Sequence, residues 1–380
     1  MKIALITADF PPIEGGLSRL STDLAHFLHA NDSLSGVLAP ELKGGDPFDQ
    51  SVDYPISRVS GYNWGVSRIV PGFVRSFEFR RAILPHTDQI LAINPSFGGL
   101  YGWMGSKMGG MPPYSLFAYG FEFLKCEDSA WKKGLLLKLY SNARKVFAIS
   151  RFTREELIRF GVPTEKVYLC PLGVDTEVFR PEKIPGKSRL KLSPETEGPI
   201  LLSVGRLIER KNHLQVLKCL KQLRGDFAGI EYWIVGRGPE EKKLKSFVRK
   251  EGLEKQVKFW GLIPDEDLPQ FYQACDLFLL PAKQEGASVE GLGLVLQEAA
   301  ACGKPTVGGR SGGIPDALID GSTGLLVEPD NTEELCSKLS TLLSSPEKME
   351  RMGKAGLDWV RSERSWEVCV KRLVEMMEND

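Results

Sequence analysis

Short apolar runs alternate with helical patterns in two series along this chain, and this alternation constrains the fold more than any other feature. The run KIALITA, residues 2–8, is typical of a strand buried on both faces, and a loop and a helical pattern over 17–30 follow it. A second series begins with PILLSVG, residues 199–205. Alternating strands and helices predict parallel sheets with crossover helices. We therefore expect an α/β fold of two Rossmann-like, doubly wound domains that face a cleft.

The chain is too long for one hydrophobic core. At 380 residues it exceeds the size at which a single core usually stops growing, so two domains are the first expectation. A segment rich in proline, glycine and charge, over about 171–198, separates the two series and is the expected linker. The expected domains are residues 1–180 and residues 181–364.

Charge and cysteine usage argue against several classes of protein. The 49 basic and 49 acidic side chains cancel, which argues against a nucleic-acid-binding protein that depends on a global positive field. The seven cysteines are scattered without a CxxC spacing, so neither a disulfide framework nor a zinc site is predicted. The apolar run in MKIALITADFPP is too short for a signal peptide or a membrane span. The sequence favours a cytoplasmic protein.

Four segments directly follow expected strands, which is where open parallel sheets bind their ligands. In the first, Gly15 and Gly16 precede a helix and would let an anionic group approach backbone N–H groups; the alternative is simple turn geometry. In the second, Arg206 follows a strand and Lys211 comes five positions later. A guanidinium fork with an ammonium point charge suits a diphosphate, and the alternative is two solvated surface cations.

The third segment is VGRGP, residues 235–239, which contains Arg237. It lacks the third glycine of a dinucleotide-binding fingerprint, so its match to that motif is weak. We interpret it as a strand-to-helix turn with Pro239 at the first helical position, where the backbone could contact a nucleotide.

The fourth segment is EGLGLVLQE, in which Glu290 and Glu298 are eight positions apart. With glycines at 291 and 293 in a turn, the N–H groups of Gly291, Leu292, Gly293 and Leu294 would form an anion cradle before a helix. In this arrangement one carboxylate would accept hydrogen bonds from sugar hydroxyls, and the backbone amides would bind a phosphate. The second carboxylate would accept hydrogen bonds from a ribose diol. The alternative is that both glutamates face solvent.

Two patterns that resemble metal sites are better explained by helices. Asp265 and Asp267 form a D-x-D pair, but their sequence context is that of acidic residues in the first turn of a helix. His26 and His29 share one helix without a third ligand cluster. No metal site is predicted.

Six motifs in a fixed order extend over nearly the whole chain. They are DFPPIEGG, PLGVD with Phe179 and Pro181, SVGRLIERK, VGRGP, GLIPDEDLPQFYQACDLFLLPA and EGLGLVLQEAAACGKPTVGGRSGGIPDAL. In this order and spacing they resemble the large retaining glycosyltransferase family four, most strongly over about 198–335. Within that family the chain is most similar to bacterial mannosyltransferases of the phosphatidylinositol mannoside type and their cell-surface glycan relatives.

The resemblance implies a GT-B fold, in which two Rossmann-like domains face each other and the last helix, here about 365–380, crosses back to the first domain. It also implies a nucleotide-diphosphate sugar bound mainly by the second domain. GDP-mannose is the leading expectation for this donor, with UDP-N-acetylglucosamine or UDP-glucose next. The resemblance implies neither a cofactor nor a metal.

The resemblance also assigns roles to matched positions. Arg206 and Lys211 would hold the diphosphate, Glu298 the ribose hydroxyls, and Glu290 the hydroxyls of the donor sugar. Gly16 and the amides over 291–294 would contact phosphate or sugar.

The base of the nucleotide would lie near Arg237 and the segment 262–264, which includes Leu262 and Ile263. Enzymes of this family are thought to retain the anomeric configuration without a protein nucleophile, because the leaving diphosphate helps to deprotonate the acceptor on the same face. Catalysis by Arg206, Lys211 and the helix end would then be chiefly electrostatic.

One segment departs from the family pattern. Many relatives carry a histidine in an HGxE-like segment of the first domain, whereas this chain reads AYGFE, with Tyr119 and Phe121. A catalytic histidine therefore cannot be assigned. Tyr119, Gly120 and Glu122 are the residues expected to line the acceptor side.

The segment 64–84 mixes Arg68, Arg75, Arg80 and Arg81 with aromatic and aliphatic residues. Such a stretch can lie on an anionic bilayer, on the inner face of the membrane, and reach a lipid-linked or cell-surface glycan acceptor. The alternative is an ordinary amphipathic helix with a solvated face.

Three other functions use the same fold. A sugar-nucleotide 2-epimerase is one, although such epimerases lack this spacing of two glutamates. A phosphorylase would need a pyridoxal-binding lysine and a much longer chain. A non-catalytic sugar-nucleotide-binding protein is the third, because a fold alone does not decide between catalysis and binding.

Overall fold

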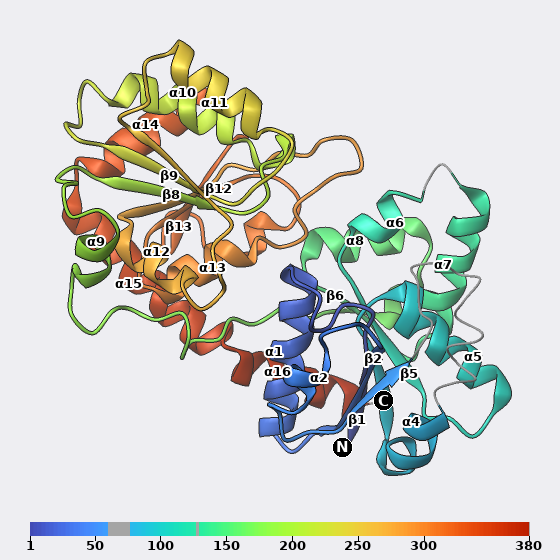
Figure 1. The fold of residues 1–380 in the computed structure, drawn as a ribbon. Helices are drawn as coiled ribbons and strands as arrows, with labels where there is room; N and C mark the ends of the chain where they lie inside the picture. Colours follow the sequence, from blue (N-terminus) through green and yellow to red (C-terminus); the bar gives the residue numbers. More distant parts are fainter. Residues whose placement is uncertain (60–76, 127–128, 380) are drawn as a thin grey trace. The chain divides into compact units, whose positions relative to one another are not determined.

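A computed structural model describes residues 1–59, 77–126 and 129–379 of the chain (Figure 1). The chain divides into two compact units. Unit 1 contains Met1–Gly173 and Trp366–Asp380, and unit 2 contains Val174–Ser365. The chain therefore leaves unit 1 at Gly173, before the boundary expected at residue 180, and returns to it at Trp366.

Unit 1 is built on a seven-stranded sheet in the order β3-β2-β1-β4-β5-β6-β7. Its pairings between described strands are parallel. The strands are β1 (Ile3–Ile6), β2 (Leu34–Pro40), β3 (Ile56–Val59), β4 (Gln89–Ala92), β5 (Tyr114–Ala118), β6 (Val146–Ala148) and β7 (Val167–Leu169). β1 is fully buried, as its continuous apolar run predicts for a strand covered on both faces.

The helices of unit 1 are α1 (Gly16–Ala30), α2 (Asp46–Asp49), α4 (Phe77–Ala82), α5 (Leu100–Met108), α6 (Phe121–Leu124), α7 (Ala130–Asn142), α8 (Arg151–Phe160) and α16 (Trp366–Glu378). Short helical turns lie at Leu84–His86, Pro95–Gly99 and Thr164–Lys166. α8 is capped at its start by Ser150, whose Oγ accepts a hydrogen bond from the Thr153 N–H, and at its end by Gly161 in the left-handed region.

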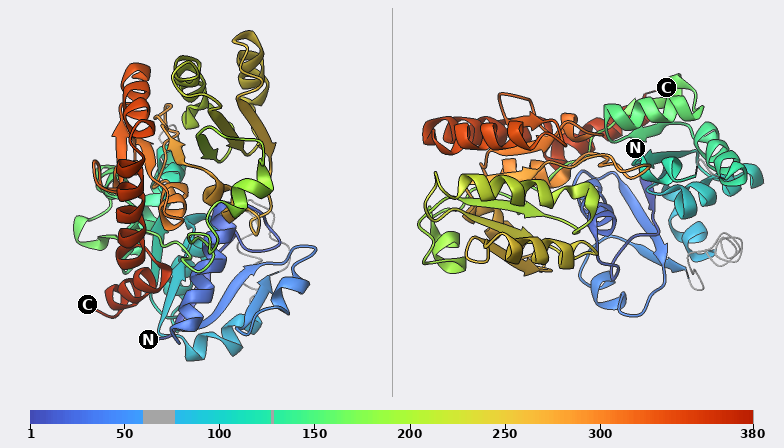
Figure 2. Two further views of the ribbon diagram at one scale, coloured as in Figure 1. Left: turned by 90° about the vertical axis from the view of Figure 1, so that its left-hand side faces the viewer. Right: turned by 90° about the horizontal axis from the view of Figure 1, so that it is seen from above.

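The last helix, α16, packs against α1 within unit 1. The Trp366 ring stacks on Phe27 at 6.3 Å between centroids, and its Nε1 donates to Asp23 at 3.3 Å. The close approach of Trp366 leaves no room for a side chain at position 173, because a Cβ there would lie 2.7 Å from the Trp366 Cα. At the other end of α16 the Met1 amino group lies 3.3 Å from Glu378, so the two termini are neighbours (Figure 2).

Unit 2 contains a six-stranded sheet in the order β10-β9-β8-β11-β12-β13. Its strands are β8 (Ile200–Val204), β9 (Glu231–Val235), β10 (Val257–Gly261), β11 (Leu277–Leu280), β12 (Thr306–Gly309) and β13 (Gly324–Val327). Its helices are α9 (Lys187–Leu192), α10 (His213–Leu223), α11 (Glu241–Lys250), α12 (Leu268–Ala274), α13 (Leu294–Ala301), α14 (Thr332–Leu343) and α15 (Pro346–Glu363), with short turns at Glu209–Lys211 and Ile314–Asp316.

Helices cover both faces of this sheet, with α10, α11 and α14 on one face and α12 and α13 on the other (Figure 1). Alternate residues of β8 enter the two cores: Ile200 and Leu202 pack with α12 and α13, and Leu201 packs with α10 and α14. All pairings among the described strands are parallel. The predicted fold class, two doubly wound parallel-sheet domains, is confirmed.

Two glycine turns at the ends of β8 and β9 pack directly on each other. Gly205 and Gly236 have φ angles of 142° and 132°, which favour glycine. A Cβ on Gly236 would lie 2.0 Å from the Gly205 carbonyl oxygen. The turn after β9 can therefore approach the turn after β8 only when position 236 lacks a side chain.

We expect Gly236→Ala to lower the free energy of unfolding by about 2–4 kcal/mol, because it adds both backbone strain and overpacking. Gly225→Ala is the matched control, since no atom lies within 4 Å of its Cβ position, and it should change stability by less than about 1 kcal/mol. Chemical denaturation of both variants measures the difference. Equal effects would show that the contact between the two turns does not constrain position 236.

Candidate functional site

The expected donor residues of unit 2 follow four neighbouring strands. In the sheet order β10-β9-β8-β11, Leu262 follows β10, Arg237 follows β9, Arg206 follows β8, and the loop with Glu290 follows β11. Because the strands are parallel, their carboxyl ends share one edge of the sheet. Arg206, Arg237 and Leu262 are exposed, Leu262 at 68 %. The structure thus brings the four segments to the same edge.

Lys211 is held beside the end of β8. It ends a short turn, and only 9 % of the residue is exposed. A Cβ on Gly205 would lie 3.5 Å from the Lys211 Nζ, so the ammonium group lies next to the glycine turn. The next residue, Asn212, fixes this turn by donating from its side chain to the carbonyl oxygens of Pro281 and Pro329, at 3.2 and 2.7 Å.

Glu290 is ion-paired with two cations. Its Oε2 lies 2.7 Å from Arg210 Nη1 and 2.8 Å from Lys211 Nζ. The side chains are 15 %, 16 % and 10 % exposed, in the order Glu290, Arg210, Lys211. Burial alone would raise the pKa of Glu290, but the positive charges of Lys211 and Arg210 outweigh this effect and hold the pKa below its usual value. The carboxylate is therefore ionised at neutral pH, and two cations share one anion.

Arg210 is the residue of this cluster that the sequence analysis missed. Arg206 and Lys211 are the cations expected to hold a diphosphate, and no ion pair of Glu290 was expected; the structure pairs Glu290 with Arg210 and Lys211. Arg206 is exposed and belongs to the same edge of the sheet. Both Arg206 and Arg210 follow β8, and nothing in the letters RLIERK shows which guanidinium turns inward.

The backbone of Glu290 is fixed by the turn before the 3₁₀ segment Ile314–Asp316. Gly313 N–H donates to the Glu290 carbonyl oxygen at 2.9 Å. Gly312 has a φ of 55°, and a Cβ on it would lie 2.4 Å from the same oxygen. Glycine at position 312 therefore allows the close approach that sets the position of Glu290.

The anion cradle expected between the two glutamates has the backbone that it requires. α13 begins at Leu294, and Gly293 precedes it in the left-handed region with a φ of 86°. Within the described part of the chain, the N–H groups of Gly291, Leu292, Gly293 and Leu294 make no hydrogen bond. Such unpaired N–H groups before a helix suit an anionic ligand.

Glu298 lies inside α13 and is buried, with 5 % exposure. Its Oε2 accepts a hydrogen bond from the Tyr272 hydroxyl at 2.6 Å. Tyr272 belongs to α12 and packs against Phe179, one of the residues of the family motif, at 5.7 Å between ring centroids. The sequence analysis missed Tyr272, because an aromatic residue inside a helix is usually a core residue.

The expected base-binding residues lie at the ends of β9 and β10. The Arg237 side chain lies over the turn after β10, where a Cβ on Gly261 would be 3.5 Å from Arg237 Nε. Ile263 packs against the core cluster with Trp260, whereas Leu262 is an exposed apolar residue. An exposed leucine beside a guanidinium offers one apolar and one cationic surface to a planar base.

A second group of polar side chains lies in unit 1, after three neighbouring strands. In the order β1-β4-β5, Asp9 follows β1, Asn94 follows β4 and Tyr119 follows β5. Asn94 Nδ2 donates to Asp9 Oδ2 at 3.3 Å. Burial raises the pKa of Asp9, although the hydrogen bond from Asn94 opposes this shift. The buried Tyr119 hydroxyl has no hydrogen-bond partner among the described residues.

Glu122 holds the turn after β5. Its Oε1 accepts from the Tyr119 N–H at 2.7 Å and from the Tyr140 hydroxyl at 2.9 Å. Gly120, between them in the turn, has a φ of 107°. Burial raises the pKa of Glu122, even though these hydrogen bonds favour the ionised form. Glu122 therefore positions Tyr119, and Asp9 and Asn94 are the neighbours that the sequence analysis missed.

Gly15 and Gly16 stand at the start of α1 in unit 1, whereas the other expected donor residues belong to unit 2. Gly15 has a φ of 136°, and no atom lies within 4 Å of a Cβ built on either glycine. The space beside this helix end is therefore open within unit 1.

The remaining sequence patterns fall outside these two groups. The residues 64–76, with Arg68 and Arg75, lie outside the described residues. Arg80 and Arg81 belong to α4, where Arg81 is exposed.

His213 is buried, and its Nδ1 lies 3.0 Å from the Tyr232 hydroxyl. Burial lowers the pKa of His213 to about 3. In the described part of the chain, no three His, Cys, Asp or Glu side chains are grouped to hold a metal ion.

The chain matches two family models, one for each half. Residues 14–178 match "Glycosyltransferase Family 4", and residues 186–359 match "Glycosyl transferases group 1". The chain belongs to these glycosyltransferase families. The resemblance inferred from the motifs is therefore confirmed. The polar side chains of unit 2, together with Asn94, Tyr119 and Glu122 of unit 1, lie within the matched regions, whereas Asp9 precedes the first of them.

Two full-length relatives are mannosyltransferases. The "GDP-mannose-dependent alpha-(1-6)-phosphatidylinositol monomannoside mannosyltransferase" of Mycobacterium tuberculosis is 27 % identical, over 100 % of this chain and 98 % of its own length. The "GDP-mannose-dependent monoacylated alpha-(1-6)-phosphatidylinositol monomannoside mannosyltransferase" of Corynebacterium glutamicum is 29 % identical with the same coverage.

Solved structures share the fold over the whole chain. HepE of Anabaena in complex with UDP has a TM-score of 0.82 at 20 % identity, covering 99 % of both chains. Sucrose-phosphate synthase of Thermosynechococcus elongatus has a TM-score of 0.80 at 22 % identity, covering 99 % of this glycosyltransferase and 98 % of its own chain. The predicted GT-B fold is confirmed. No helix in the described residues is both long and apolar enough to cross a membrane.

We expect Glu290→Gln to lower the free energy of unfolding at pH 7 by about 2–4 kcal/mol, because it leaves Arg210 and Lys211 without their carboxylate. The pKa of Glu290 is lowered in the folded state, so its contribution is complete above the unfolded value near 4.5 and is lost as the pH falls through the lower folded value. The deficit of the variant should therefore shrink on acidification. Denaturation of wild type, Glu290→Gln and the exposed control Glu285→Gln between pH 7 and pH 3 tests this; a deficit that does not change with pH would contradict it.

We expect Glu122→Gln to raise the stability of the glycosyltransferase at pH 7. The amide oxygen can accept both hydrogen bonds of Glu122 without the cost of a buried charge. The pKa of Glu122 is raised in the folded state, so the wild type loses stability as the pH rises from about 4.5 through the folded value. The gain should disappear below pH 4.5 in thermal unfolding experiments. Glu122→Gln that is less stable than wild type at pH 7 would contradict this account.

Proposed function

We propose that this glycosyltransferase moves a sugar, with mannose as the first candidate, from a nucleotide-diphosphate sugar to a lipid-linked or cell-surface glycan acceptor with retention of configuration. The observation that carries the proposal is the set of groups at one edge of the unit 2 sheet: a two-cation, one-carboxylate cluster and unpaired N–H groups before α13. The two mannosyltransferase relatives, which match the chain over its full length, support the choice of sugar and acceptor.

Each part of the donor has a partner of suitable chemistry in unit 2. Arg206, Lys211 and the amides over 291–294 supply positive charge for the diphosphate. Glu298, which accepts a hydrogen bond from Tyr272, would accept from the ribose hydroxyls, and Glu290 would accept from the hydroxyls of the sugar. Arg237, Leu262 and Ile263 offer surfaces to the base. Gly15 and Gly16 would add backbone contacts from unit 1.

The reaction breaks the bond between the anomeric carbon and the diphosphate oxygen and forms a bond from that carbon to the acceptor oxygen. The acceptor proton passes to the departing diphosphate on the same face, so no protein nucleophile is required. Negative charge grows on the diphosphate as the bond breaks, and fixed cations and N–H groups stabilise it without reorganisation. We propose that these groups act without a metal ion or a cofactor.

Lys211 is a cation that Glu290 and the donor diphosphate would share. In the structure its ammonium group is paired with Glu290. A diphosphate would compete for this ammonium group, while the sugar hydroxyls would become new donors to the Glu290 carboxylate. The exchange keeps every charge paired before and after binding, which avoids the cost of isolated buried charges.

We propose Tyr119, with Asp9 and Asn94, as the polar surface for the acceptor in unit 1, in the position where relatives carry a histidine. Its partnerless hydroxyl can donate to, or accept from, an acceptor hydroxyl. Gly120 and Glu122 set the turn that carries it. Lipid acceptors would be reached from the membrane surface, through residues that include the segment 64–84.

Thermal unfolding with nucleotides and their sugars tests the donor site. GDP-mannose, or failing it UDP-glucose or UDP-N-acetylglucosamine, should raise the melting temperature, because a ligand that binds only the native state stabilises it. Transfer to a phosphatidylinositol mannoside acceptor should give a product with the anomeric configuration of the donor by NMR, and EDTA should not abolish it. No stabilisation by any of these donors would refute the site, and an inverted product would refute the mechanism.

Two substitutions separate the roles of the glutamates. Glu298→Ala should weaken binding of the free nucleotide about ten-fold or more, because it removes a charged hydrogen-bond acceptor for the ribose. Glu290→Gln should lower kcat at least about 100-fold without weakening the binding of free nucleotide, because its partner is the sugar and because the diphosphate no longer competes with a carboxylate for Lys211. Calorimetry and steady-state kinetics, at a temperature where both variants are folded, measure the two effects; equal effects in both variants would contradict the assignment.

A further inference from the structure

A cavity of about 450 Å³ lies in unit 2 between the segment 180–191 and α12. We call it the α9 pocket, since α9 forms one wall. Its lining residues are Arg180, Pro181, Glu182, Lys183, Ile184, Lys187, Ser188, Lys191, Gln270 and Gln273. None of them belongs to the donor groups described above.

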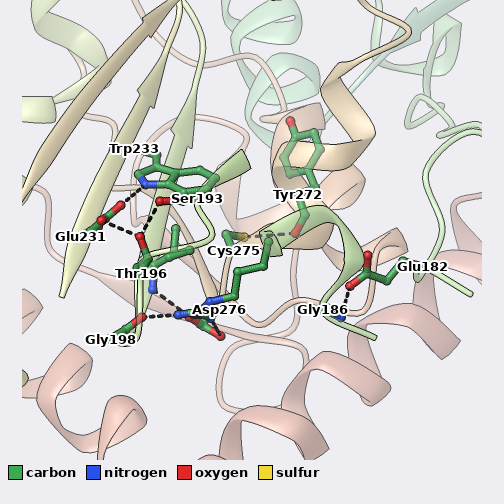
Figure 3. Close-up of polar contacts among 12 residues, drawn as sticks. Glu182, Gly186, Ser193, Thr196, Gly198, Glu231, Trp233, Tyr272, Cys275 and Asp276 are labelled. Carbon is green, nitrogen blue, oxygen red and sulfur yellow. Dashed lines mark hydrogen bonds and ion pairs between the residues drawn. The ribbon is translucent and has the colours of Figure 1, made fainter. Parts of the chain in front are cut away.

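The lining is cationic, with four basic side chains and one carboxylate. The carboxylate, Glu182, is already used: its two oxygens accept from the backbone N–H groups of Gly186 and Ser188 at 2.6 and 2.9 Å. Figure 3 shows the bond between Glu182 and Gly186. These bonds fold the loop before α9, and each oxygen of Glu182 accepts a hydrogen bond from a backbone N–H group.

The basic residues are poorly neutralised. Lys183 and Lys187 are exposed and form no ion pair within the described part of the chain. Lys191 donates to the Gln270 side-chain oxygen at 2.5 Å, which provides an acceptor without a charge. Arg180 pairs with Glu177, which is 81 % exposed, at 3.2 Å. Lys187 and Lys191 are four positions apart in α9, so they share one face of the helix.

α9 is held firmly by its other face. Arg189 Nη1 lies 2.9 Å from Asp276 Oδ2, and the same oxygen accepts from the Ile200 N–H at 2.7 Å. Asp276, which Figure 3 places beside Gly198, directly precedes β11, and Ile200 is the first residue of β8. The pocket is therefore attached at the amino ends of the strands, whereas the donor residues follow the carboxyl ends.

We propose that the α9 pocket binds the phosphate group of an anionic ligand, at a site separate from the donor site. Several ammonium groups around one concave surface repel each other unless an anion lies between them, and a phosphate can accept from more than one of them. Asp276 and the Glu182 loop fix the backbone that carries the lysines, so only their side chains need ordering when the anion binds.

The phosphate can belong to an anionic phospholipid headgroup or to a soluble organic phosphate. Ile184 and Leu190 flank the lysines and are 62 % and 67 % exposed, which is the pairing of apolar and basic residues that favours a bilayer surface. The two sources share the same ionic contacts. They differ in whether Ile184 and Leu190 contribute to binding.

The test uses the full-length chain and the triple variant K183Q/K187Q/K191Q. In the first arm, co-sedimentation is measured with vesicles of phosphatidylcholine containing one-fifth phosphatidylglycerol. In the second arm, titration calorimetry with inorganic pyrophosphate is carried out in an Arg206→Ala background, which weakens the donor site. The matched control K218Q/K250Q/K354Q removes three exposed lysines elsewhere in unit 2. I184S/L190S probes the apolar contribution.

We expect the triple variant to weaken binding about ten-fold or more in at least one arm, because each lysine near an anionic surface contributes about five-fold. The control should stay within about three-fold of the parent. A loss in the vesicle arm that I184S/L190S reproduces identifies a lipid headgroup, and a loss only with pyrophosphate identifies a soluble phosphate. If the triple variant binds like the control in both arms, the proposal is refuted. The proposed function is tested separately, because nucleotide binding by the wild type in the same preparations would still support it.

Discussion

The ion pairs of Glu290 with Arg210 and Lys211 are the interaction on which the edge of unit 2 proposed to bind the donor depends. They connect the turn after β8 to the loop after β11, so two neighbouring strand ends are joined by charge as well as by backbone. Desolvation opposes every buried charge, and two cations on one carboxylate still leave positive charge in excess. That excess is the property a site for anionic ligands requires. The same three side chains therefore contribute to the stability of unit 2 and to the proposed binding of the donor.

The pKa values of buried carboxyl groups are shifted in opposite directions in the two units. In unit 2, neighbouring cations overcome burial and lower the pKa of Glu290, so the group remains charged. In unit 1, Asp9 and Glu122 have hydrogen-bond donors, no cation among the described residues lowers their pKa, and burial raises the pKa of each. The site proposed for a charged donor is thus built from ions, and the surface proposed for hydroxyl groups from polar side chains of low charge. The difference in pKa shift comes from the groups that surround each carboxyl group, because both kinds of carboxyl group are buried.

Much of the fold was readable from the sequence because parallel strands buried on both faces are short, continuous apolar runs. The segments that follow those runs led to the prediction of Arg206, Lys211, Arg237 and Glu290 as site residues, and the structure brings these segments to one edge of the sheet. The strand order was not readable, so Asp9 and Asn94, which meet only because β1, β4 and β5 are neighbours, were missed. Arg210 was missed for a local reason, since a short helical turn decides whether its guanidinium or that of Arg206 faces Glu290. Tyr272 was missed because its hydroxyl finds Glu298 across two helices.

The path of the chain has a consequence for biosynthesis. Residues 174–365 form one uninterrupted unit, whereas unit 1 needs both the beginning and the end of the sequence, with Trp366 packed against Phe27 and residue 173. Domains usually fold in the order in which the ribosome releases them. Here most of unit 1 emerges before unit 2, but unit 1 cannot complete its packing until α16 has left the ribosome. Until then the surface of α1 that receives Trp366 stays uncovered, so residues made after unit 2 complete unit 1.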